Sequence, residues 1–152
     1  MSRLGLRRFV VSGSSMSPAF TDGDRFIGRP AGRRRPPRRG SVVAFTHPCR
    51  SGFWLVKRVV GLGGEVVSIE TGEVLIDGQA GLDLWGNGWS TAHGEWMRHD
   101  RELFVLSDQR PATRDDSRSF GPIGTRGLYR MVFPPGSHKR RIQDPGLPGG
   151  PR

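Results

Sequence analysis

The chain has 152 residues and a formal net charge of +10, and this length suits one domain with tails. A hydrophobic fraction of 34% permits a modest core, while 23 glycines and 12 prolines favour short strands and turns over long helices. The single cysteine, Cys49, excludes an internal disulfide and gives no sign of an oxidising compartment. No apolar run approaches the roughly 20 residues of a membrane-spanning helix, and no signal peptide is visible.

The apolar segments predict a mostly β domain over residues 9–135, between an N-terminal extension at 1–8 and a disordered basic tail at 136–152. The expected strands are, in chain order, 9–11, 25–27, 41–46, 53–60, 65–69, 73–76, 102–106 and 128–133. One helical turn is expected at 16–20, and Asp77-Gly78 is a hairpin signal. The connections are otherwise short turns.

Two segments interrupt this pattern, a basic Pro/Arg loop at 30–39 and a Trp-bearing insertion at 79–101. The basic loop and the start of the tail hold much of the positive charge. Such charge either attracts anionic lipid or nucleic acid, or belongs to a solvated loop. Because no nucleic-acid motif accompanies it, no specific nucleic-acid partner is expected, whereas peripheral contact with an anionic membrane stays open.

The sequence predicts neither a metal site nor a cofactor. Its four histidines are scattered, without the spacing of metal ligands. The run Gly61-x-Gly63-Gly64 follows an expected strand but opens no helix, so it does not fit a nucleotide-binding loop.

Ser15 lies in the turn Gly13-Ser14-Ser15-Met16-Ser17-Pro18, directly after the first expected strand. The turn would lift the hydroxyl out of the sheet, and the backbone N–H groups around it can stabilise the charge that develops in acyl transfer. Taken alone, a serine in such a turn is usually only a turn residue. Its hydroxyl becomes a good nucleophile when a base removes its proton.

Lys57 is a candidate for that base. Period-two alternation places it on one strand face with Phe53, Leu55 and Val59. An enclosed lysine loses hydration, which lowers its pKa toward the range of a working base. The alternative is a lysine that extends to solvent, and periodicity does not decide because both faces of the strand are apolar. Arg58 points the other way and fits a structural ion pair.

A third polar cluster, Asp115-Asp116-Ser117-Arg118-Ser119, follows Ser107-Asp108-Gln109 by a few residues. It can fix a lysine amine by hydrogen bonds and a wall of the site by an Asp–Arg pair. The alternative is a solvated loop.

These segments together resemble the type I signal peptidase family of Ser–Lys proteases. The four matching boxes, in the family's order, are 13–18, then 23–27 with 39–45, then 57–67, and 107–109 through 116–121. The resemblance covers about residues 9–133. It implies a multi-sheet catalytic β-fold of the signal peptidase/LexA-like kind with short helical turns.

The resemblance implies a serine endopeptidase that works through an acyl-enzyme without a cofactor. Ser15 would be the nucleophile, Lys57 the general base, and Thr113 the replacement for a family serine that hydrogen-bonds the lysine. The oxyanion and supporting residues would be Gly13, Ser14, Met16, Asp116, Ser117 and Arg118. A polypeptide with an N-terminal leader would bind as an extended strand and be cut after small residues.

The sequence also departs from the family pattern. Ser107 and Gln109 replace the usual glycine and asparagine, and Gly63 and Glu65 stand where proline and aspartate are commoner. The family's N-terminal membrane anchor is not visible. The resemblance therefore predicts association with a membrane, while the residues alone predict a cytoplasmic protein.

Three alternatives stay open at this point. One is a soluble maturation protease of the nickel superoxide dismutase type. Another is a LexA-type self-cleaving regulator, with Ala80-Gly81 as its internal site, although residues 1–12 are too few for a helix-turn-helix. The non-enzymatic alternative is a basic β-module that binds an anionic membrane or nucleic acid through residues 33–39.

Overall fold

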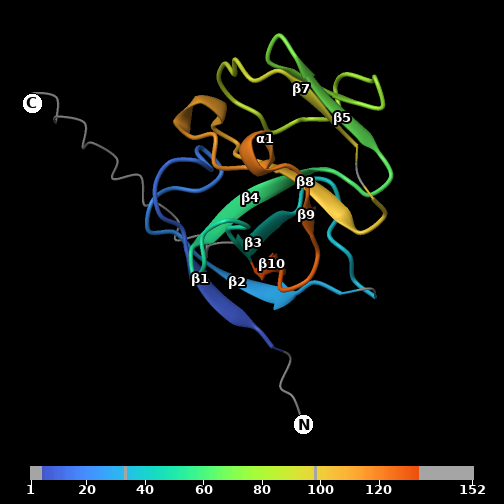
Figure 1. The fold of residues 1–152 in the computed structure, drawn as a ribbon. Coiled ribbons are helices and arrows are strands. Elements are labelled where there is room, and N and C mark those ends of the chain that lie inside the picture. The colour runs from blue at the N-terminus through green and yellow to red at the C-terminus, as the bar shows by residue number, and fades with distance from the viewer. Residues whose placement is uncertain (1–4, 33, 98, 134–152) are drawn as a thin grey trace, which may run out of the picture.

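The computed structural model describes residues 5–32, 34–97 and 99–133, and these form two antiparallel β-sheets (Figure 1). The larger sheet has the strand order β1-β2-β10-β3-β4-β8-β9. Its strands are β1 (Arg7–Val10), β2 (Arg25–Pro30), β3 (Val42–Thr46), β4 (Trp54–Gly61), β8 (Glu102–Leu106), β9 (Ile123–Gly124) and β10 (Tyr129–Phe133). The smaller sheet has the order β6-β5-β7, with β5 (Val66–Glu70), β6 (Glu73–Ile76) and β7 (Gly94–Met97). The predicted mostly β fold is confirmed.

Two single-turn helices follow β8 in the described part of the chain, η1 (Arg110–Ala112) and α1 (Ser117–Phe120). They interrupt the polar segment that the sequence presents as a loop. In Figure 1, α1 lies beside β8, between the large sheet and the smaller sheet. This position brings the polar cluster of residues 115–119 against the middle of the fold.

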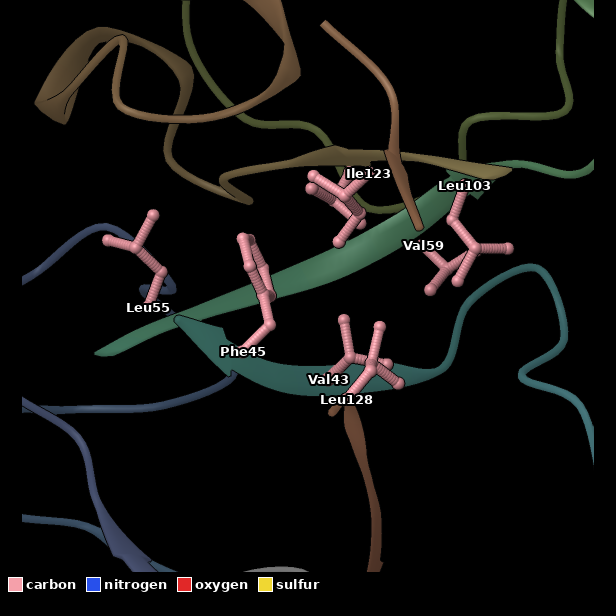
Figure 2. Packing of buried hydrophobic residues seen from close by; sticks show 8 residues of the cluster. Val43, Phe45, Leu55, Val59, Leu103, Ile123 and Leu128 are labelled. Atoms are coloured by element: carbon pink, nitrogen blue, oxygen red, sulfur yellow. The ribbon is translucent and has the colours of Figure 1, made fainter. Parts of the chain in front are cut away.

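Both faces of β3 and β4 are covered by apolar side chains, which explains why these strands lack a polar alternation. On one face Val43 and Phe45 of β3 pack with Leu55 and Val59 of β4 (Figure 2). On the opposite face the cluster is Phe9, Val11, Met16, Phe20, Phe26, Val42 and Ala44. A third cluster joins the two sheets through Val60, Phe104, Leu106, Val67, Ile69, Val74, Ile76 and Ala92. Side chains at the centre of β4 are therefore buried on either face of the strand.

The insertion at 79–101 contributes a strand to the smaller sheet, which the sequence did not indicate. Its β7 pairs with β5, with Trp96 opposite Val67. The tight turn predicted at Asp77-Gly78 forms, closed by backbone hydrogen bonds of 2.9 Å between Ile76 and Gln79, but no second strand follows it. The next strand pairs with β5 instead, because a turn signal sets local dihedral angles and not the partner of the strand beyond it.

Other boundaries differ slightly from the expectation. Arg7 and Arg8 of the expected extension belong to β1, and β2 continues to Pro30 at the start of the basic loop. Residues 16–20 form hydrogen-bonded turns and not a helix, with the Phe20 N–H donating to the Met16 carbonyl at 2.9 Å. The basic tail at 136–152 lies outside the described residues. Among those that are described, no helix combines the length and apolar character needed to cross a bilayer.

Candidate active site

The turn that carries Ser15 is held at both ends. Gly13 has φ +83°, a left-handed conformation that favours glycine, and its N–H donates to Asp22 Oδ1 at 2.8 Å. The Ser17 N–H closes the turn on the Ser14 carbonyl at 3.0 Å. Met16 has no exposed surface and anchors the turn in the core. Ser15 itself is half-buried between the exposed Ser14 and this anchor.

A backbone hydrogen bond ties the Ser15 turn to the segment that follows β8. The Gln109 N–H donates to the Ser15 carbonyl at 2.9 Å. Beside this contact lies an open pocket of about 360 Å³, lined by Ser14, Ser17, Gln109, Pro111 and Ala112. The first and last of the four boxes therefore meet, although nearly a hundred residues separate them in the chain.

Lys57 lies on β4 opposite Val43 of β3, and only 2% of its surface is exposed. It shares its strand face with Leu55 and Val59, so its side chain does not extend to solvent. Burial lowers the pKa of the Lys57 amine, because the charged form loses its hydration. The nearby carboxylates of Asp116 and Asp115 act in the opposite direction without cancelling that effect. A neutral amine is the form that can accept a proton.

The Asp116–Arg118 pair forms a buried wall of the site and is not a solvated loop. Arg118 Nε and Nη2 donate to the two Asp116 carboxylate oxygens at 2.9 and 2.7 Å. Asp116 also caps α1 through the Arg118 N–H and accepts the Ser107 N–H at 3.0 Å. Burial alone raises the pKa of the Asp116 carboxyl, but these hydrogen bonds and the Arg118 charge hold that pKa below its usual range. Asp116 is thus a fixed anion facing Lys57.

Ser117 and Thr113 both have structural hydrogen bonds. The Val105 N–H on β8 donates to Ser117 Oγ at 2.9 Å, which docks α1 on the strand. Thr113 Oγ1 accepts the Asp115 N–H at 3.0 Å, and the Thr113 carbonyl accepts Arg118 Nη2 at 2.6 Å. In the described part of the chain, no hydrogen bond joins either hydroxyl to Lys57. The contact that the resemblance implied for Thr113 is therefore not made in this structure.

Arg58, on the opposite face of β4, forms the ion pair that the sequence suggested. Its Nε donates to Asp108 Oδ1 at 3.0 Å, its Nη2 binds Asp108 Oδ2, and its Nη1 donates to the Gly40 carbonyl at 3.0 Å. The guanidinium carbon also lies 5.5 Å from the centre of the Trp85 ring. Each of the three guanidinium nitrogens thus has an oxygen partner, which stabilises the buried charge.

The insertion at 79–101 supports the arginines around the site, and no sequence signal indicated this. Besides Trp85 on Arg58, Asp83 Oδ2 accepts Arg110 Nη2 at 2.6 Å. Ser90 Oγ accepts Arg118 Nη1 at 3.2 Å. Three side chains of the insertion therefore hold three arginines. Their partners lie more than 25 residues away, beyond the range of any local pattern.

Asp115, the second carboxylate near Lys57, is held by two side chains from the β3–β4 connection. His47 Nε2 lies 2.8 Å from Asp115 Oδ1, and Arg50 Nη2 donates to Asp115 Oδ2 at 2.7 Å. Both oxygens of the Asp115 carboxylate are therefore bound to side chains other than Lys57. Across the residues that the structure describes, no group of His, Cys, Asp and Glu side chains has the arrangement of a metal site.

The domain thus ties a serine-bearing turn to the segment that follows β8, the strand paired with the one that carries the buried lysine. Residues 5–130 match the signal peptidase family, peptidase S26, so the chain belongs to that family. It is 37% identical over 90 residues to signal peptidase I of Leptolyngbya laminosa, a match that covers 50% of this chain and 44% of that protein. The chain thus spans less than half of this relative's length.

A second curated relative and a crystal structure point to the same family. Signal peptidase I V of Bacillus subtilis is 26% identical over 140 residues, which cover 82% of each protein. The crystal structure of a signal peptidase I from Enterococcus faecalis matches with a TM-score of 0.53 and 26% identity, over 64% of this chain and 97% of that one. The predicted family and fold are confirmed, and they favour the protease over the other interpretations.

Proposed function

We propose that this protein is a signal peptidase I-like serine endopeptidase in which Ser15 is the nucleophile and Lys57 the general base. One observation carries the assignment. Lys57 is enclosed on β4 with a lowered pKa, and the Ser15 turn is hydrogen-bonded to Gln109, just beyond the end of the neighbouring strand. The enclosed amine supplies the base that a serine hydroxyl needs.

The reaction follows from these groups. The Lys57 amine removes the Ser15 hydroxyl proton as Oγ attacks the scissile carbonyl carbon, and the same proton then passes to the departing amine nitrogen. Among the described residues the Ser15 N–H has no acceptor, which leaves it free to stabilise the oxyanion. Water, deprotonated by Lys57, then attacks the acyl-enzyme ester, releases the new carboxyl end, and regenerates the Ser15 hydroxyl.

The supporting residues have distinct parts in this proposal. Gly13 gives the turn its left-handed dihedral angle, and Met16 fixes it to the core. Asp116 and Arg118 form the charged wall behind Lys57, while Ser117 docks that wall on β8. Thr113 supports this wall, since its Oγ1 accepts the Asp115 N–H and its carbonyl accepts Arg118 Nη2.

The substrate would be a polypeptide with an N-terminal leader, since family membership implies a signal peptide. The open pocket beside Ser15, walled by Pro111 and Ala112, would receive the small side chain before the cut. The chain around it would lie extended and pair with backbone groups.

Family membership also suggests association with a membrane. The arginines of the basic loop provide a second, electrostatic reason for peripheral contact. Arg34, Arg35 and Arg38 line an open pocket with Arg130 and give this side of the molecule a positive surface. Anionic headgroups are attracted to such a surface within about 10 Å. Binding to vesicles with and without phosphatidylserine tests this contact, and equal binding to both would exclude it.

Cleavage of a peptide with an Ala-x-Ala site by the purified protein tests the catalytic assignment. We expect Ser15→Ala to lower kcat/KM at least about 10³-fold. Ser12→Ala is the matched control, because Ser12 is exposed just before the same turn, and it should cleave like the wild type. Wild-type activity in Ser15→Ala would refute the nucleophile. A leader peptide without an apolar core, compared with one that has it, separates a soluble maturation protease from a signal peptidase.

A further inference from the structure

The buried hydroxyl of Ser107 has no hydrogen-bond partner among the described residues. Ser107 has no exposed surface, and its backbone is fully used, since its N–H donates to Asp116 Oδ2 and its carbonyl accepts Arg110 Nε at 2.7 Å. A buried hydroxyl without a partner is unfavourable and uncommon. The side chain is therefore held in place by its backbone, with its own hydrogen-bonding capacity left for another group.

The register of the β4–β8 pair, continued one position beyond the end of β8, puts Ser107 opposite Lys57. In the antiparallel β4–β8 pair, Val59 faces Val105 and Arg58 faces Leu106, so the next position pairs Lys57 with Ser107. Val59 exchanges its backbone hydrogen bonds with residues 40 and 41, on the β3 side. The backbone N–H and C=O groups of Lys57, two residues earlier on the strand, therefore also point toward β3. The pair with Ser107 is thus a non-hydrogen-bonded one, in which opposed side chains come closest.

The two side chains also point to the same face. Leu103 and Val105 of β8 pack with Leu55 and Val59 of β4 in one cluster (Figure 2 labels all but Val105). Alternation along each strand continues this face to Ser107 and Lys57. The charged groups that surround Lys57 are already engaged: Asp116 with Arg118, Asp115 with His47 and Arg50, and Asp108 with Arg58. The Ser107 hydroxyl has no partner in this structure, Lys57 included, so both of its lone pairs are available to a donor on the same face.

We propose that Ser107 is a positioning residue that accepts an N–H hydrogen bond from the Lys57 amine and so directs the amine's lone pair toward Ser15. A neutral lysine amine has two N–H donors and one lone pair, and fixing one donor restricts the direction of the lone pair. Thr113, which the resemblance implied for this contact, has its Oγ1 bound to the Asp115 N–H. The residue usual at the Ser107 position is glycine, so the hydroxyl is a property of this chain. The inference rests on the proposed function of Lys57.

The protein is well suited to a direct measurement, because Lys57 and Lys139 are its two lysines. In a Lys139→Arg background, lysine labelled with ¹³C at Cε gives an NMR signal from Lys57 alone. A hydrogen-bond acceptor favours the ammonium form, so Ser107→Ala should lower the pKa of Lys57 below its wild-type value. Ser68→Ala is the control, since Ser68 is a buried serine in β5 of the smaller sheet and should leave that pKa unchanged.

Peptide cleavage provides the second measurement. We expect Ser107→Ala to lower kcat roughly tenfold with little change in KM, because Ser107 does not line the pocket beside Ser15. The acidic limb of the kcat profile should move to lower pH together with the Lys57 pKa. Ser107→Gly, which leaves space for a water to replace Oγ, should recover part of the rate.

The outcomes separate this inference from the function on which it rests. If Ser107→Ala leaves both the Lys57 pKa and kcat at their wild-type values while Ser15→Ala is inactive, the positioning role is wrong and the dyad stands. If Ser15→Ala cleaves normally, the proposed function is wrong whatever the NMR titration shows. A shifted Lys57 pKa with a reduced kcat supports the positioning role.

Discussion

Lys57 and Arg58 are adjacent basic residues on the two faces of β4, and their surroundings differ. Both are largely buried, at 2% and 9% exposure. Arg58 is matched by the carboxylate of Asp108, whereas the carboxylates near Lys57 are each bound to other cations. Burial of a charge is tolerated when hydrogen bonds replace its hydration, and otherwise the group shifts its pKa. One face therefore keeps a structural charge, while the other provides a base.

The largest expected effect comes from removing the base without disturbing the other face. Lys57→Met keeps an unbranched side chain without the amine, and we expect kcat/KM for the Ala-x-Ala peptide to fall about 10²–10⁴-fold. The Tm should stay the same or rise, because a desolvated amine is replaced by an apolar side chain. A parallel measurement of activity and Tm checks both statements. Retained activity would remove Lys57 from the mechanism.

Removing the Arg58 cation from the other face of β4 should lower the free energy of unfolding, in contrast to Lys57→Met. Arg58→Met leaves the buried Asp108 carboxylate without its partner, which we expect to cost about 3–5 kcal/mol in the free energy of unfolding. Urea denaturation measures this loss. The double variant Arg58→Met/Asp108→Asn should recover part of it, because no charge then stays buried and unpaired. An unchanged midpoint in the single variant would show that the ion pair is not structural.

The pH dependence of the free energy of unfolding should also distinguish Lys57 from Asp116. The folded-state pKa of Lys57 lies below the ordinary lysine value of 10.5, so the unfolded chain binds the extra proton between these two values, and stability rises with pH in that interval. Lys57→Met should remove this rise. The lowered pKa of Asp116 acts in the same direction in the acid range, because the unfolded chain binds the extra proton between the folded-state value and 3.8, and its stabilisation is lost as pH falls through that interval. Unfolding curves from acid to alkaline pH test both intervals.

The smallest expected effect concerns the insertion. Trp85→Ala removes a ring from the Arg58 guanidinium, and a cation–π contact of this kind contributes about 0.5–2 kcal/mol. Trp89→Ala is the control, because Trp89 is exposed and makes no ring contact with an arginine among those recorded for the described residues. If both variants unfold at the same urea concentration, the insertion does not support the Arg58 face.

The strands were largely predictable because burial on both faces leaves runs of apolar residues that turns separate. The expected strand at 102–106 coincides with β8, and that at 73–76 with β6. The short polar boxes around Ser15, Lys57 and Asp116 could be found from their order alone. In contrast, β7 was missed because its residues alternate weakly, and because its pairing with β5 is a contact over some 30 residues.

The sequence by itself determined which residues could do chemistry, since the types and order of Ser15, Lys57 and the Asp116–Arg118 segment are local properties of the chain. It also determined that Lys57 and Arg58 lie on opposite faces, because alternation along a strand is local. Only the tertiary structure decided that the amine is enclosed without an ion pair of its own, and that Ser107 lies across the sheet from it. Burial and register depend on which strands become neighbours, and that choice is made by the whole core.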